Sequence, residues 1–235
     1  MRPSKKTSKF EEQEMKKILL ASSAILLGIT LNGNVAKAEP SGDIIIKEYV
    51  ISYYAEPNDY FYQARLNYLY GYNRAASNEI RRGARFLSNE AEKVSGDIRK
   101  QLLESYDNLN DMAASIEDGD YYTIADMNYT FSESLIYLAK EQNMFARHYW
   151  KENEKDSAGE ALLAATNNIR HAYGWVQEKI GKDDYNALNN IRNKARSLAK
   201  GDKADVSSAF NTLSGIISRL EKRLEVIQVQ YESVD

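Results

Sequence analysis

Residues 124–140, IADMNYTFSESLIYLAK, determine the fold class of this chain. Apolar side chains recur there at spacings of three and four residues, at Ile124, Met127, Phe131, Leu135 and Leu138. This spacing places them on one face of an α-helix, and such a face must be covered by other elements. The stretch therefore predicts a helix that contributes to a shared hydrophobic core.

The chain from residue 58 onward extends this pattern. The prolines are Pro3, Pro40 and Pro57, so residues 58–235 contain none. A proline-free stretch rich in Ala, Leu, Glu, Lys and Asn, with apolar residues at helical spacing, favours nearly continuous helix that is interrupted at glycine and aspartate. The sequence predicts an all-α fold of six helices, over about residues 60–93, 98–118, 124–150, 157–181, 183–200 and 206–227.

Two sets of residues predict where individual helices end and begin. Gly119 suits the left-handed conformation that ends a helix, and Asp120 is placed to cap the next helix. Ser157 and Glu160 have the spacing of a capping box, in which each side chain accepts a hydrogen bond from the other residue's backbone N–H. We therefore expect a helix to begin at residue 157.

The chain also resembles itself. Residues 75–81, AASNEIR, match residues 164–170, AATNNIR, and the apolar set of residues 124–138 falls on Val206, Ala209, Leu213, Ile217 and Leu220. We interpret this as an internal repeat of residues 60–150 and 157–231, giving a six-helix bundle of two similar three-helix halves built as tandem αα-hairpins. The alternative is that two amphipathic helices align through their shared periodicity.

The N-terminal residues have the order of a secretory signal peptide. Lys16 and Lys17 precede the apolar stretch 18–31, and Ala36-Lys37-Ala38 is a small-x-small cleavage site. We expect a signal peptide over residues 1–38, cleavage between Ala38 and Glu39, and a periplasmic or secreted product without a transmembrane segment. Residues 1–14 are then either a long n-region or an over-extended start.

Residues 39–57 differ in composition from the helical region after them. The stretch 44–54, IIIKEYVISYY, is dense in β-branched and aromatic residues and precedes Pro57. We expect an extended N-terminal arm that lies along a groove of its own domain, ahead of a helical domain over residues 58–235. The alternative is an arm exchanged with a partner chain.

Composition and motifs exclude several kinds of chemistry. The chain has no cysteine, and cleavage at Ala38 leaves 24 basic against 31 acidic residues, which disfavours nucleic acid as a partner. His148 and His171 lack a Glu three positions earlier, nucleophile and phosphate-loop motifs are missing, and helical acids such as Glu90 beside Lys93 are expected to face solvent. We therefore expect no enzyme, no cofactor and no metal site.

Aromatic and basic residues concentrate near the start of the helical domain. Tyrosine offers a large, rigid contact surface with a polar tip, and arginine binds carboxylates bidentately. The candidate interaction surface comprises Tyr60, Tyr62, Tyr68, Tyr72, Arg74, Arg81, Arg82 and Arg85. The alternatives are that the tyrosines pack in the core and that the arginines pair with the chain's own carboxylates.

These patterns favour a non-enzymatic, exported interaction or accessory module that binds a protein of the bacterial cell envelope. A second hypothesis is a small-molecule binder that holds an apolar or anionic ligand between the halves, lined by tyrosines, Phe131 and Trp175. A third is a periplasmic metal-binding protein that uses His148 and acidic helix faces.

Overall fold

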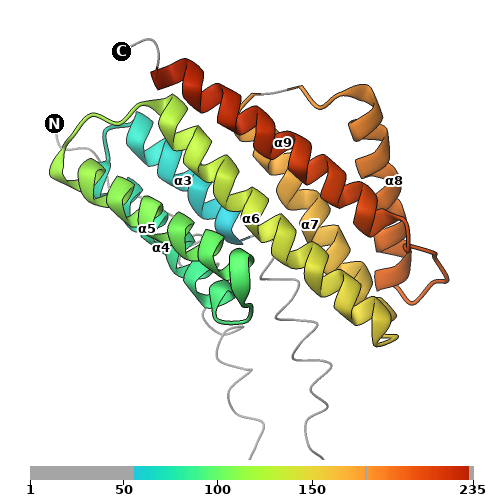
Figure 1. The fold of residues 1–235 in the computed structure, drawn as a ribbon. Coiled ribbons are helices and arrows are strands. Elements are labelled where there is room, and N and C mark those ends of the chain that lie inside the picture. Colours follow the sequence, from blue (N-terminus) through green and yellow to red (C-terminus); the bar gives the residue numbers. More distant parts are fainter. Residues whose placement is uncertain (1–55, 178, 233–235) are drawn as a thin grey trace, which may run out of the picture. The chain divides into compact units, whose positions relative to one another are not determined.

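The computed structural model describes residues 56–177 and 179–232, which form seven α-helices and no strand (Figure 1). The helices are α3 (Glu56–Leu69), α4 (Asn73–Ala91), α5 (Gly96–Asp118), α6 (Ile124–Lys151), α7 (Lys155–Trp175), α8 (Lys182–Ala199) and α9 (Ala209–Glu232). The all-α prediction is confirmed. The expected signal peptide and residues 39–55 of the expected arm lie outside the described residues. None of the helices described is both long and apolar enough to cross a membrane.

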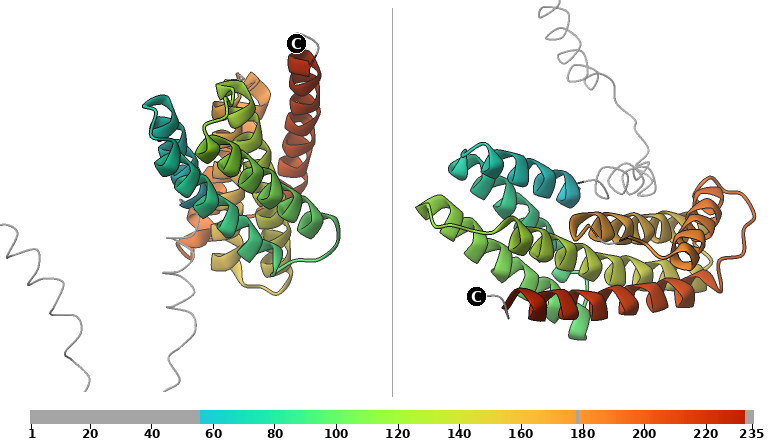
Figure 2. Two further views of the ribbon diagram at one scale, coloured as in Figure 1. Left: turned by 90° about the vertical axis from the view of Figure 1, so that its left-hand side faces the viewer. Right: turned by 90° about the horizontal axis from the view of Figure 1, so that it is seen from above.

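Helix α6 is the centre of the packing. It contacts α3, α5, α7 and α9, while α4 pairs with α5 and α7 pairs with α8. Figure 2 shows α9 running alongside α6. The apolar face predicted for residues 124–138 is buried as expected, because Met127, Phe131 and Leu135 have no exposed surface.

Three aromatic side chains join α3, α6 and α7 in the core. Phe61 stacks on Phe131 with ring centroids 4.4 Å apart, and Trp175 meets Phe131 edge-on at 5.1 Å. The indole Nε1 of Trp175 donates a hydrogen bond to Oδ1 of Asn58 at 3.0 Å. Helix α4 approaches this cluster at Gly83, where a Cβ atom would lie 2.4 Å from Cε1 of Phe61. The absence of a side chain at Gly83 is therefore what allows α4 to pack so closely.

The prediction of one helix over residues 60–93 is wrong. Helix α3 ends at Leu69 and α4 begins at Asn73, with Gly71 between them at a φ of +76°. The backbone N–H of Tyr72 donates to the carbonyl of Asn67 at 2.8 Å, which closes the turn. A left-handed glycine ends a helix readily because it has no Cβ atom to clash. The described residues therefore hold seven helices, against the six predicted.

The start of α6 is only partly as predicted. Gly119 adopts a φ of +87° and ends α5, as expected. Asp120 does not cap α6; Thr123 does, because its Oγ1 accepts a hydrogen bond from the backbone N–H of Asp126 at 3.0 Å. The three residues between Asp120 and Ile124 therefore belong to a loop.

The capping box predicted at Ser157 and Glu160 is wrong. Helix α7 begins two residues earlier, at Lys155, and its N-cap residue is Glu154, whose side chain makes no capping hydrogen bond. The preceding break lies at Asn153, whose φ of +64° separates α6 from α7. Helix α7 also ends at Trp175, well before Gly181.

Candidate functional site

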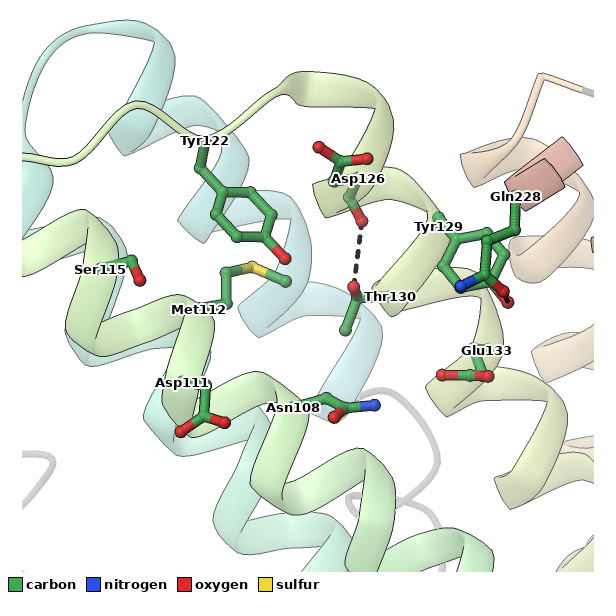
Figure 3. A pocket seen from close by; sticks show the side chains of 10 residues that line it. All are labelled: Asn108, Asp111, Met112, Ser115, Tyr122, Asp126, Tyr129, Thr130, Glu133 and Gln228. Carbon is green, nitrogen blue, oxygen red and sulfur yellow. Dashed lines mark hydrogen bonds between the residues drawn. The ribbon is translucent and has the colours of Figure 1, made fainter. Parts of the chain in front are cut away.

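A pocket of about 370 Å³ opens between α5, α6 and α9 (Figure 3). Its walls are Asn108, Asp111, Met112 and Ser115 of α5, Tyr122 of the following loop, Asp126, Tyr129, Thr130 and Glu133 of α6, and Gln228 of α9. On α5 and α6 these positions recur every three or four residues, so each helix presents one face to the pocket. The volume is at the lower end of that of ligand pockets.

The lining of this pocket is acidic. It contains the carboxyl groups of Asp111, Asp126 and Glu133 and no lysine or arginine. Burial raises the pKa of Glu133, and this effect outweighs the hydrogen bond from Tyr137 Oη at 3.0 Å, which lowers the pKa. The negative charges of Glu104 and Glu221 raise it further. The pocket therefore favours a positively charged occupant and disfavours an anion.

Hydrogen bonds hold the pocket walls in place. Thr130 Oγ1 donates to the backbone carbonyl of Asp126 at 3.0 Å, which Figure 3 marks with a dashed line. At one side of the pocket, Tyr129 Oη donates to Oε1 of Gln228 at 3.0 Å and so links α6 to α9. Burial raises the pKa of Tyr122, and the negative charge of Asp126 adds to this effect. Tyr122 therefore remains a neutral phenol in the lining of an acidic pocket.

The tyrosines of the predicted interaction surface divide between exposed and structural positions. Tyr62 and Tyr72 are exposed, whereas Tyr60 is half-buried with the guanidinium of Arg82 5.2 Å from its ring centroid. Tyr68 is also half-buried, and its Oη donates to the carbonyl of Tyr122 at 2.7 Å and accepts from the N–H of Tyr122 at 3.0 Å. Tyr68 therefore fixes the loop before α6 to the end of α3.

Two of the predicted arginines pair with the chain's own carboxylates. Arg81 of α4 contacts Oε2 of Glu117 of α5 at 2.5 Å, and this holds the pKa of Glu117 below its ordinary value. Arg82 contacts Glu79 at 3.1 Å on the same helix. Arg74 and Arg85 are exposed on α4.

The structure groups exposed aromatic residues that sequence reasoning did not combine. The Tyr68–Tyr122 hydrogen bonds bring together the α3–α4 turn and the α5–α6 loop. The exposed fractions there are 57% for Leu69, 72% for Tyr70, 63% for Tyr72 and 86% for Tyr121. We call these four residues the aromatic end. The signal in the sequence was a tyrosine within two residues of a helix-ending glycine in both segments, Gly71 and Gly119.

A pair of acids lies in the core, contrary to the expectation that Glu90 faces solvent. Glu90 of α4 and Glu141 of α6 have no exposed surface. Lys93 Nζ contacts Oε1 of Glu90 at 2.9 Å, but burial outweighs this contact and raises the pKa of Glu90. Burial, and then the charge of Glu90, raise the pKa of Glu141 to about 10. Glu141 is therefore protonated at neutral pH.

Two of the sequence hypotheses receive no support from the geometry. His148 and His171 are exposed, and in the described part of the chain no three His, Asp or Glu side chains come together as a metal site. Phe131 and Trp175 fill the core and do not line the pocket described above. No protein-family model, curated protein or solved structure matches the chain.

Proposed function

We propose that this chain is an exported, non-enzymatic helical module that binds a protein of the bacterial cell envelope through its aromatic end. The observation on which this rests is the exposure of Leu69, Tyr70, Tyr72 and Tyr121 on a framework that is fixed by the Tyr68–Tyr122 hydrogen bonds. The order of basic, apolar and small residues over 16–38 supports export to the periplasm or beyond.

The aromatic end has the properties of a binding hot spot. Its side chains are large, and tyrosine loses little conformational entropy when it is covered. Covering one exposed ring removes on the order of 100 Å² from water, worth about 2.5 kcal/mol. A small set of such residues is enough to dominate the affinity of an interface.

Nearby charges indicate the chemistry of the partner. Asp118 and Asp120 are exposed and precede Tyr121, while the nearby Glu117 is already paired with Arg81. A partner segment with Lys or Arg beside apolar side chains complements this arrangement. The excess of acidic over basic residues after cleavage at Ala38 also favours a positively charged partner.

The proposal also takes residues 60–150 and 157–231 as two related units, of which the first spans the four helices α3–α6 and the second the three helices α7–α9. In support, Ser77 and Thr166 are both fully buried at matching positions, as are Ile80 and Ile169. The position that matches Tyr121 holds an exposed lysine, Lys203. Since the second unit makes the corresponding loop without tyrosine, the fold itself does not require the aromatic end.

The test is capture of a partner from native envelope extract by the purified chain and two variants. Tyr121→Ser is expected to reduce capture at least tenfold, whereas Tyr185→Ser, at another exposed tyrosine on α8, leaves capture unchanged. Capture is also expected to weaken with salt because Asp118 and Asp120 contribute. Equal capture by wild type and Tyr121→Ser, or no reproducible partner, contradicts the proposal.

A second candidate function is binding of a small organic ammonium compound in the pocket between α5, α6 and α9. The specific observation is a lining with three carboxyl groups, two tyrosine rings and no basic residue. Putrescine is expected to raise the melting temperature of the wild type but not of Glu133→Gln, compared with NaCl at equal ionic strength. An equal rise for both proteins argues against this site.

A further inference from the structure

A second pocket, of about 340 Å³, lies further along α6, beside the start of α5 and the first half of α9. Its apolar wall is formed by Ile98, Met144 and Ile217, and its polar wall includes Asn143, Arg147 and Ser214. Neither the aromatic end nor the acidic pocket shares a residue with it. An apolar wall that faces a polar wall is typical of a site for an amphipathic ligand.

The partners of Arg147 in the described part of the chain are neutral. Its Nη2 donates to Oδ1 of Asn211 at 2.9 Å and to Oγ of Ser214 at 3.1 Å, and its guanidinium lies 5.8 Å from the ring centroid of Phe210. No carboxylate of the described residues forms an ion pair with it. These contacts hold the guanidinium at the pocket and leave its charge available for an anion.

Lys140, the other cation of this pocket, is already paired. Its Nζ contacts the carboxylate of Glu221 on α9 and also donates to Oε1 of Gln101 at 3.3 Å. An anionic group therefore gains more from Arg147 than from Lys140.

Asn143 lines the same pocket, and its side-chain oxygen Oδ1 accepts no hydrogen bond. The side chain is 4% exposed, and its Nδ2 donates to the carbonyl of Phe210 at 3.1 Å and to Oγ of Ser214 at 2.9 Å. These bonds fix the amide orientation, because a flipped amide would place Oδ1 against the carbonyl of Phe210. In this orientation Oδ1 is buried and has no hydrogen-bond partner. A buried acceptor of this kind favours a ligand that brings an N–H group.

We infer that this pocket binds the carboxylate end of an apolar α-amido acid, meaning the C-terminal residue of a peptide or an N-acyl amino acid. Arg147 holds the carboxylate, Asn143 Oδ1 accepts the amide N–H, and Ile98, Met144 and Ile217 contact the apolar side chain. Asn143 and Arg147 are one helical turn apart, about 6 Å along α6, and both donate to Ser214 Oγ. A carboxylate and an N–H group on the same carbon atom suit two protein groups that converge in this way.

The required N–H distinguishes this ligand class from a fatty acid, which has a carboxylate and an apolar chain but no donor at neutral pH. Met144 adapts its flexible side chain to different apolar shapes. The site is therefore expected to select the terminal group and to tolerate several apolar side chains.

The experiment is calorimetric titration of the full chain with ligands that each lack one feature. N-acetyl-L-leucine is expected to bind, while N-acetyl-L-leucinamide, without the carboxylate, and 4-methylpentanoate, without the N–H, each bind at least tenfold more weakly. A hexapeptide ending in leucine that binds tighter than N-acetyl-L-leucine identifies a peptide terminus as the source, and equal binding identifies the free acyl amino acid.

The matched variants are Arg147→Gln and Arg99→Gln, which remove the same charge inside and outside the pocket. Arg147→Gln is expected to weaken N-acetyl-L-leucine at least tenfold, and Arg99→Gln is expected to leave binding unchanged. Circular dichroism checks that both variants are folded. Absent binding of N-acetyl-L-leucine at millimolar concentration, equal binding by Arg147→Gln, or equal binding of 4-methylpentanoate overturns the inference. None of these outcomes depends on the aromatic end.

Discussion

Replacing Glu141 with glutamine is expected to stabilise the helical domain at neutral and alkaline pH. Glu141 has no exposed surface, and burial together with the charge of Glu90 raises its pKa from 4.5 to about 10. The folded chain therefore keeps this carboxyl group protonated at pH values where the unfolded chain ionises it. Glutamine has the same shape and stays neutral in both states, so the variant avoids this proton uptake on folding.

The magnitude follows from proton linkage. Because the pKa of Glu141 is higher in the folded state, that state binds one more proton than the unfolded state between about pH 5.5 and 9. The contribution is fully present below pH 4.5 and is lost as the pH rises toward 10, at about 1.4 kcal/mol per pH unit. Between pH 6 and pH 8 the free energy of unfolding is expected to fall by about 3 kcal/mol through this group.

The assay is urea unfolding followed by circular dichroism at pH 5, 6, 7 and 8. Glu141→Gln is expected to lack this slope, to match the wild type near pH 5 and to exceed its free energy of unfolding by a few kcal/mol at pH 8. Glu92→Gln changes an exposed acid next to the end of α4 and is the control, with the slope of the wild type. If the wild type and Glu141→Gln show the same pH dependence, the burial of a protonated Glu141 is refuted.

Two further predictions concern the packing of α3. Tyr68→Phe removes the hydroxyl that bonds both backbone groups of Tyr122, so the free energy of unfolding is expected to fall by about 1–3 kcal/mol in urea titrations; an unchanged value contradicts the role of this link. Gly83→Ala places a Cβ 2.4 Å from Phe61 and is expected to lower the free energy of unfolding by about 1–3 kcal/mol. The control is Gly174→Ala, whose Cβ meets nothing within 4 Å and which is expected to leave this free energy unchanged or to raise it by up to about 1 kcal/mol. Thermal unfolding measures both, and equal melting temperatures of the two variants contradict the close packing at Gly83.

The helices themselves were predictable because their signals are local. The spacing that defines the face of Met127, Phe131 and Leu135 is complete within four turns, and those side chains are buried. The break at Gly71 was equally local, but the apolar residues on either side of it continued at helical spacing and hid it. Periodicity therefore identifies which residues are buried more reliably than it locates the ends of helices.

The buried acids show what a single helix face leaves undetermined. Glu90 and Lys93 have the spacing of a solvent-exposed pair, and that interpretation was wrong for Glu90. The contrary signal was present, because Glu90 lies three residues after Leu87 and four before Val94, both of which are buried. What the sequence could not supply was the partner, since Glu141 reaches Glu90 only through the packing of α6 against α4.

The pockets could not be predicted from the sequence because their lining residues come from helices that are far apart along the chain. Asp111, Asp126 and Glu133 each look like ordinary surface acids on their own segments, and Gln228 lies almost one hundred residues further along the chain. They become one environment only because α5 and α9 both pack on α6. The aromatic end arises in the same way, from two short connections that Tyr68 joins. The binding properties proposed for this chain therefore depend on the junctions between helices, so variants of Tyr121, Glu133 and Arg147 at these junctions test the three proposals separately.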